Sequence, residues 1–246
     1  MKFNAITASM ALGLALSSLG TSVQAASFSE GFNGTALPAG WVATNVSTRA
    51  STGNPWGVGA GIQDGNGNIV VPPHEGNGFA LVNYTSIGSG SGTINNWLIS
   101  PLITGMNNGD TFSFYTTTTS ASSYPDRLEF RLSTGSGTNV GTTVTGVGSF
   151  TTTLLSINPT QAVGGYPETW TQYTVTLSGL TAPIDGRVAF RYFVTSAGPT
   201  GINSNIIGVD QFSYVSAVPE PGTWALMAGG LLGVAALRRR KSTDQA

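Results

Sequence analysis

The sequence predicts an all-β protein in which residues 26–217 form one antiparallel two-sheet jelly-roll sandwich. Short β-branched and aromatic runs are separated there by clusters of Gly, Pro, Asn and Ser. Several runs alternate apolar and polar residues, which is typical of antiparallel sheets with one buried and one solvated face. About nine such runs in about 190 residues suit a single sandwich domain with its own core.

The expected strands, in chain order, lie at 27–32, 78–84, 96–103, 111–119, 127–133, 150–156, 169–177, 187–195 and 206–215. Alternation is clear at 111–119, where the phenylalanines share one face. In 127–133 the apolar residues are expected to face the core, which leaves Arg127, Glu129 and Arg131 in water. Helical periodicity is hard to find anywhere in the domain.

Composition limits what the domain can do. Charged residues make up 9% of the chain, well below the usual quarter. Between 26 and 217, nine acidic residues against five arginines and no lysine give a net charge near −4, which argues against nucleic-acid binding. Cysteine is absent, so thiol nucleophiles and thiolate metal sites are excluded. The Gly- and Ser-rich segments 86–92 and 134–148 are expected to be mobile surface loops.

The N-terminus has the pattern of a secretory signal peptide. Lys2 supplies the charged region, an apolar stretch follows, and Val23 and Ala25 are small residues suited to signal peptidase cleavage after residue 25. We therefore expect residues 26–217 to function outside the cytoplasm.

The C-terminal segment 218–241, here called the sorting tail, has three parts. A short motif is followed by a 14-residue apolar run at 224–237 and then by a basic cluster. A helix of that length spans about 21 Å, less than a bilayer core of about 30 Å. The cations are expected on the cytoplasmic side, with 242–246 as a cytoplasmic tail. A simple single-pass anchor is the alternative. The motif is Val218, Pro219, Glu220, Pro221 and the basic cluster is Arg238, Arg239, Arg240, Lys241.

This order of motif, apolar span and basic cluster resembles the PEP-CTERM sorting signal of Gram-negative bacteria that export polysaccharide. The resemblance implies recognition by an exosortase, a membrane transpeptidase-like enzyme, after a transient stay in the inner membrane. The tail would be removed near Pro219-Glu220-Pro221, and the domain would reach the cell surface or extracellular matrix.

Within the domain, the segments at 28–32, 37–41, 96–101 and 208–212 resemble the choice-of-anchor J domain. That group is similar to cleaved-adhesin and MAM-type jelly rolls. The Trp-Leu-Ile-Ser-Pro segment beginning at Trp97 is its most distinctive piece. The resemblance implies a surface or matrix role without an assigned reaction.

Two groups of oxygen ligands are candidates for structural calcium. Glu30 and Asp210 lie on the first and last expected strands, which are often neighbours in jelly rolls, and related adhesin-type jelly rolls bind calcium near the chain termini. Six to eight oxygens surround calcium, so two carboxylates and backbone carbonyls would suffice. The alternative is that each carboxylate caps a turn or accepts strand-end amides.

The second calcium candidate copies the ligand spacing of an EF-hand loop. The copy is incomplete, because Ile69 replaces the required glycine and Pro72 and Pro73 forbid the following helix. An Asx-rich surface turn is the alternative. Its ligands would be Asp64, Asn66, Asn68 and Glu75.

For sugar stacking, Trp56 is the tryptophan expected to be exposed, since Pro55 and Gly57 flank it in a polar loop. Tyr84, Tyr124 and Tyr166 also border loops. The sequence predicts an exported, non-catalytic, adhesive or exopolysaccharide-associated protein. A specific carbohydrate-binding module is one alternative. The other is a cryptic glycoside hydrolase, with a carboxylate pair drawn from Asp126, Glu129, Glu168 and Asp185.

Overall fold

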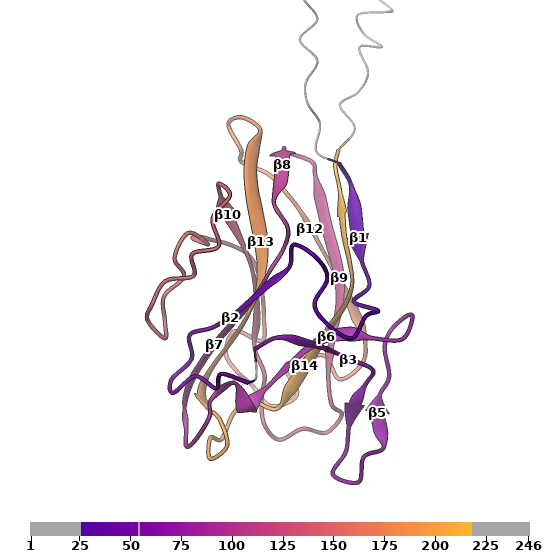
Figure 1. Ribbon diagram of the computed structural model, residues 1–246, viewed down its shortest axis with the longest axis vertical. Helices are drawn as coiled ribbons and strands as arrows, with labels where there is room; N and C mark the ends of the chain where they lie inside the picture. Colours follow the sequence, from indigo (N-terminus) through magenta and orange to yellow (C-terminus); the bar gives the residue numbers. More distant parts are fainter. Residues whose placement is uncertain (1–25, 54, 218–246) are drawn as a thin grey trace, which may run out of the picture.

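Two antiparallel sheets pack face to face and enclose the core (Figure 1). The computed structural model describes residues 26–53 and 55–217, so the predicted signal peptide and sorting tail, with its transmembrane helix, lie outside the described residues. Sheet A runs in the order β12 (Thr171–Thr176), β9 (Thr111–Thr118), β14 (Ile206–Val215), β6 (Phe79–Asn83) and β3 (Gly57–Gly59), and β1 (Phe28–Glu30) also pairs with β14.

Sheet B runs in the order β11 (Thr152–Ile157), β10 (Leu128–Thr134), β13 (Ile184–Ala197), β7 (Gly92–Ile99) and β2 (Val42–Asn45), and β8 (Ile103–Met106) also pairs with β13. A small hairpin joins β4 (Ile62–Gln63) to β5 (Ile69–Val71), and Tyr84–Ser86 forms a 3-10 turn, η1. The predicted all-β sandwich is confirmed, including the pairing of the first described strand, β1, with the last, β14.

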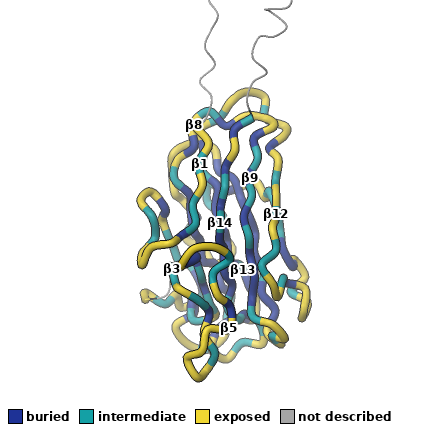
Figure 2. Tube along the Cα trace, turned by 90° about the vertical axis from the view of Figure 1, so that its right-hand side faces the viewer, coloured by how far each residue is buried: buried dark blue, intermediate teal, exposed yellow. Residues whose placement is uncertain are grey.

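Phenylalanines from both sheets meet in the core. The Phe190 ring of sheet B lies 4.8 Å from that of Phe114 in sheet A and 5.1 Å from that of Phe130, measured between centroids. Figure 2 shows buried residues along the strands and exposed ones mainly at the two ends. Complete burial of each such ring contributes about 1.5–3 kcal/mol to stability. The inward-facing residues of the alternating pattern therefore stabilise the packing of one sheet on the other.

Two expectations about strands need correction. The single strand expected at 96–103 is two strands, β7 and β8, because Pro101 cannot donate a backbone hydrogen bond to a ladder. The strands β2 to β5 were not predicted, because two to four residues are too few to show a period.

The outer face of sheet B is covered, contrary to the sequence prediction. Glu129 and Arg131 are buried rather than in water, and the segment 135–151 lies over them. Val140 and Phe150 of this segment pack on Trp97 of the sheet. The expected mobile loop is therefore a cover with a small core of its own.

Buried charge attaches this cover to the sheet. Arg191 donates from Nη1 to Glu129 at 3.0 Å and from Nη2 to the carbonyls of Thr145 and Gly146. Arg131 donates to Glu129 at 2.7 Å and to the Phe150 carbonyl at 2.8 Å. Burial alone would raise the pKa of Glu129, but Arg191, Arg131 and Arg127 outweigh it and lower that pKa. Glu129 is thus held ionised among three guanidinium groups.

The described chain begins and ends at one end of the sandwich, and several loops meet at the other (Figure 1). β14 has 10 residues, a length of about 33 Å, and connects the two ends. Among the described residues, no helix is long and apolar enough to cross a membrane.

Candidate functional site

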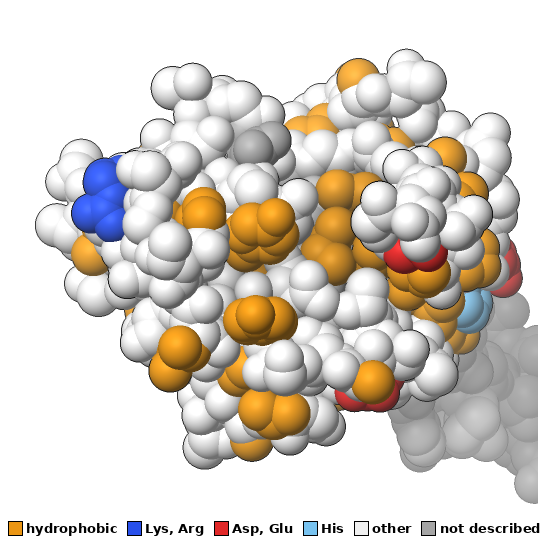
Figure 3. Space-filling view, turned by 90° about the horizontal axis from the view of Figure 1, so that it is seen from below, with side chains coloured by type: hydrophobic (Ala, Val, Ile, Leu, Met, Phe, Trp, Pro, Cys, Tyr) orange, Lys and Arg blue, Asp and Glu red, His pale blue; other side chains and the backbone are white. Residues whose placement is uncertain are grey.

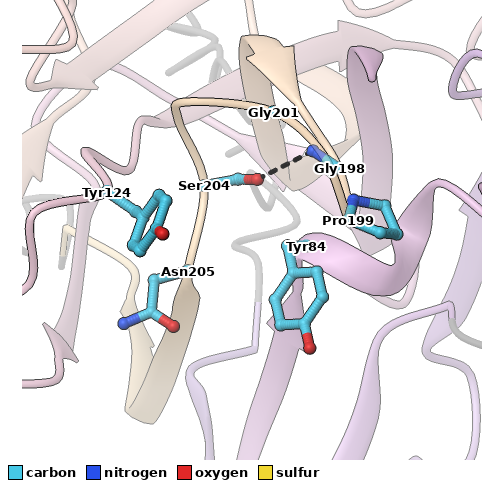
Figure 4. Close-up of a pocket in the computed structure, with 7 residues that line it drawn as sticks. All are labelled: Tyr84, Tyr124, Gly198, Pro199, Gly201, Ser204 and Asn205. Carbon is cyan, nitrogen blue, oxygen red and sulfur yellow. Dashed lines mark hydrogen bonds between the residues drawn. The ribbon is translucent and has the colours of Figure 1, made fainter. Parts of the chain in front are cut away.

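A hollow of about 270 Å³ lies among the loops at the end of the sandwich opposite the termini (Figure 1). Its lining residues are drawn in Figure 4. Hydrophobic side chains lie across the middle of this end, among mostly neutral atoms (Figure 3). The described residues lining the hollow are neutral: Tyr84, Tyr124, Gly198, Pro199, Gly201, Ser204 and Asn205.

The two tyrosines stand on opposite sides of the hollow, and Asn205 lies next to Tyr124, across from Tyr84 (Figure 4). Tyr84 begins η1, where its backbone N–H donates to the Asn205 carbonyl at 2.8 Å. Tyr124 belongs to the β9–β10 loop, where its N–H donates to Ser122 Oγ. Tyr84 is 40% exposed and Tyr124 is 50% exposed, so both residues are accessible to a ligand while backbone hydrogen bonds hold them in place.

The turn between β13 and β14 forms one wall and holds strained backbone. Ser196 and Ser204 adopt left-handed conformations with φ of 52° and 75°, which side chains rarely take. Gly198 has φ of 100°, and a Cβ there would lie 2.7 Å from the Gly90 carbonyl oxygen. The Gly198 N–H donates to Ser204 Oγ at 3.1 Å. Such strain persists only where surrounding contacts fix it, and it often marks binding sites.

Buried Asp126 links Asn205, which lines the hollow, to both sheets. Its Oδ1 accepts from the backbone N–H of Asn205 at 2.8 Å and from the Tyr192 hydroxyl, and its Oδ2 accepts from Thr118 Oγ1 at 2.8 Å. These donors belong to sheet B, sheet A and the wall of the hollow. Burial raises the pKa of Asp126 to about 6, against the opposing effect of these three hydrogen bonds.

A second hollow, of about 490 Å³, lies beside the first, and Gly201 lines both. Hydroxyl groups dominate its wall, so a chain lying across the turn would meet neutral polar atoms on both sides. Its other described lining residues are Ser91, Gly92, Thr93, Thr195, Ser196, Thr200 and Ile202.

Trp56 does not belong to this site, and the prediction that it is exposed was wrong. It is 1% exposed, its ring lies 6.5 Å from that of Phe190, and its Nε1 donates to the Asn96 carbonyl at 3.2 Å. A large ring gains most when it is buried with its N–H satisfied. The loop tyrosines differ from one another: Tyr166 is buried, while Tyr84 and Tyr124 are exposed. The sequence signal for such a site was an aromatic residue beside Gly, Ser or Asn. This signal did not show which of the aromatic residues are exposed.

The segment with EF-hand-like spacing forms a hairpin turn between β4 and β5, and calcium binding there stays a prediction. Asp64 Oδ1 accepts from the N–H groups of Asn66 and Asn68, and its Oδ2 accepts from Asn68 Nδ2. The hydrogen bonds from Asn68 and then Asn66 lower the pKa of Asp64. Asn68 therefore donates its amide to the carboxylate, and the predicted Asx-rich turn joins β4 to β5.

Glu75 lies with the other calcium candidate. The N–H groups of His74 and Glu75 donate to Asp210 Oδ2, at 3.0 and 3.3 Å. Glu30 accepts from the Phe32 N–H at 2.7 Å, and its strand pairs with the strand of Asp210. Each of the two predicted carboxylates thus accepts backbone amides. Among the described residues, no group of three or more His, Cys, Asp or Glu is placed to hold a metal.

Calcium near Glu30 and Asp210 stays a prediction, and a melt tests it. If the folded protein alone binds calcium, removing calcium present at about 100 times its Kd lowers the melting temperature by about 5–10 °C. The measurement is the melt of the exported protein with calcium and with a chelator, alongside Glu30→Gln as a variant that should lose the difference. Identical melting temperatures of the wild type in both buffers would contradict the prediction of calcium near Glu30 and Asp210.

Three of the four carboxylates considered for hydrolysis accept hydrogen bonds within the fold. Asp126 and Glu129 are buried in the networks described above, and Asp185 accepts from the Gly105 N–H at 2.9 Å. The space beside Asp126 and Glu168 is only about 10 Å³, too small for a sugar ring. His74 stacks on Tyr115 with ring centroids 3.7 Å apart.

Comparison with known proteins identifies the C-terminal signal. The PEP-CTERM protein-sorting motif matches residues 217–241. The chain carries a PEP-CTERM sorting motif. This motif directs an exported protein to the cell surface and implies processing by an exosortase.

The domain is similar in fold to cleaved adhesin domains of Lys-gingipain. The K1 domain from Porphyromonas gingivalis W83 has 23% identity and a TM-score of 0.53, with 78% of this chain and 99% of that chain covered. The K3 domain from the same organism has 20% identity and a TM-score of 0.52, with 77% of this chain and 98% of that chain covered. The expected adhesin-type fold is confirmed. No curated protein matches the chain.

Proposed function

We propose that this protein is an exported, non-catalytic adhesive component of the surface or extracellular polysaccharide layer of a Gram-negative bacterium. Signal peptidase would remove residues 1–25. The chain would then be held in the inner membrane by its sorting tail until an exosortase acts near Pro219-Glu220-Pro221. The match of residues 217–241 to the sorting motif carries this proposal.

The geometry of the domain supports an adhesive role. β14 ends at Val215, four residues before Pro219, and four extended residues span at most about 14 Å. A domain attached there would sit close to its attachment point. Its loop end, with the Tyr84–Tyr124 hollow, lies at the far end of β14 and would face the surrounding layer (Figure 1).

Replacing Pro219, Glu220 and Pro221 together with alanine is expected to stop processing. The full-length chain should then accumulate in the membrane fraction, because the tail is no longer read as a substrate. The measurement is the mass and the cell fraction of the protein in producing cells. A matched control replaces Ser242, Thr243 and Asp244 with alanine, which leaves motif and basic cluster intact. Unchanged mass and distribution in the motif variant would contradict exosortase processing.

A further inference from the structure

We propose that the hollow between Tyr84 and Tyr124 binds a neutral polysaccharide chain of pyranose rings. The inference rests on the proposed function, since it names what the exposed end of the adhesive domain contacts. It assigns the binding to two tyrosines in loops at the tip of the sandwich and not to any tryptophan.

The shape and chemistry of the hollow suit a sugar ring. A pyranose has an apolar face of C–H groups and a rim of hydroxyls, so it is recognised by an aromatic ring beside a few fixed polar groups. Tyr84 and Tyr124 offer two rings on opposite sides, and Pro199 adds an apolar surface next to Tyr84 (Figure 4). Asn205 lies next to Tyr124, across from Tyr84 (Figure 4).

Asn205 is oriented as a specificity group. Its Nδ2 donates to Thr119 Oγ1 at 2.7 Å and to Ser122 Oγ at 3.1 Å. Both amide hydrogens are thereby used on the protein side, and the side-chain oxygen lies on the side facing Tyr84 (Figure 4). An amide oxygen held in this way accepts a hydrogen bond from a sugar hydroxyl.

The charge around the hollow selects a neutral chain. None of its described lining residues is charged, and residues 26–217 carry nine acidic residues against five arginines. No cation is among the described lining residues of either hollow, and the net negative charge repels a uronate chain. Exposed Arg49, which donates to the Ser91 carbonyl, lies at the edge of the second hollow only. The hydroxyl-rich second hollow beyond Gly201 extends the same neutral surface, so successive sugars can lie across the turn.

The site is formed before a ligand arrives. The left-handed Ser196 and Ser204, the close-packed Gly198 and the Asp126 hydrogen bond to Asn205 fix its wall. A fixed wall loses little conformational entropy on binding, which favours useful affinity from a small contact.

The test is titration calorimetry with the protein expressed in producing cells and recovered in its exported form. The probes are neutral gluco-, manno-, galacto- and xylo-hexasaccharides, with hexagalacturonate as the charged comparison. We expect saturable binding of at least one neutral probe and none of hexagalacturonate. Tyr84→Ala and Tyr124→Ala should each weaken that binding about tenfold, from loss of ring stacking.

Two controls separate the site from general effects. Tyr84→Phe keeps the ring and should bind nearly as tightly as the wild type. Val163→Ala removes an apolar side chain that is 65% exposed and lies outside both hollows, so it should change nothing. The melting temperature of each variant is measured as well, and binding is compared only among variants that melt at the wild-type temperature.

The inference is overturned if no neutral probe binds, if hexagalacturonate binds more tightly, or if both tyrosine-to-alanine variants bind like the wild type. Each of these results leaves the sorting experiment untouched, because that experiment measures mass and location. Conversely, a chain that fails to be processed can still bind the neutral probe, so the two proposals fail separately.

Discussion

Replacing Asp126 with alanine is expected to lower the free energy of unfolding by about 2–5 kcal/mol, because each buried polar group that loses its hydrogen-bond partner costs about 1–3 kcal/mol. The change leaves the Tyr192 hydroxyl and the Asn205 N–H without the carboxylate that accepts from them, and it leaves Thr118 Oγ1 with the Ile206 carbonyl alone. Buried donors without acceptors are costly. These donors come from both sheets and from the hollow, so binding should weaken along with stability.

Urea unfolding of the wild type and of Asp126→Ala measures this loss. Glu168→Ala is the matched control, because Glu168 lies beside the same small space but is exposed; its cost should stay within about 0.5 kcal/mol. If the two variants unfold at the same urea concentration, the hydrogen bonds of Asp126 do not contribute measurably to the free energy of unfolding.

The same carboxylate sets a pH dependence. Its folded pKa of about 6 exceeds the ordinary value of 3.8, so between these values the folded state holds a proton that the unfolded chain releases. Asp126 therefore contributes stability that is complete below 3.8 and is lost as pH rises through 6. Lowering pH from 7 to 5 should stabilise the wild type by about 1 kcal/mol. An equal gain in Asp126→Asn would contradict the assignment.

Arg191→Ala is expected to have an effect of similar size, about 3–5 kcal/mol. Arg191 is 3% exposed, and its loss removes a cation from Glu129 and donors from Asn95 and from the carbonyls of the 135–151 cover. The cover should loosen first, so limited proteolysis should cut within 135–151 earlier than in the wild type.

The matched control for this change is Arg49→Ala. Arg49 also donates to two loop carbonyls, those of Ser89 and Ser91, but it is exposed, so its removal should cost less than about 1 kcal/mol. Arg191 would be shown to be dispensable if its variant unfolded like Arg49→Ala and resisted protease like the wild type.

Much of the fold was predictable because it rests on local pattern. The period of two places Phe112, Phe114, Phe130 and Phe190 on inner faces whatever the topology, and all four are buried between the sheets. The strands expected at 111–119 and 206–215 lie within a residue of β9 and β14. The C-terminal motif was also predictable from the sequence, since a processing enzyme recognises a signal of consecutive residues.

The candidate site was not predictable in this way, because it is assembled from three distant segments. Tyr84, Tyr124 and Asn205 meet only after β6, β9 and β14 pair side by side in sheet A. Trp56 was misplaced for a related reason: a polar loop surrounds it in sequence, yet its indole reaches the core. Neighbours in sequence do not reveal which aromatic rings a folded surface leaves open.

The sequence by itself determined the all-β class, the strand faces and the sorting tail, because alternation and linear motifs are properties of consecutive residues. Only the tertiary structure decided that Glu129, Arg131 and Arg191 lie under a cover, that Glu75 joins Asp210 instead of the Asp64 turn, and that Tyr84 faces Tyr124. The physical reason is that burial and ligand geometry depend on contacts between residues dozens of positions apart, which follow from how the sheets pair and which loops fold back over them.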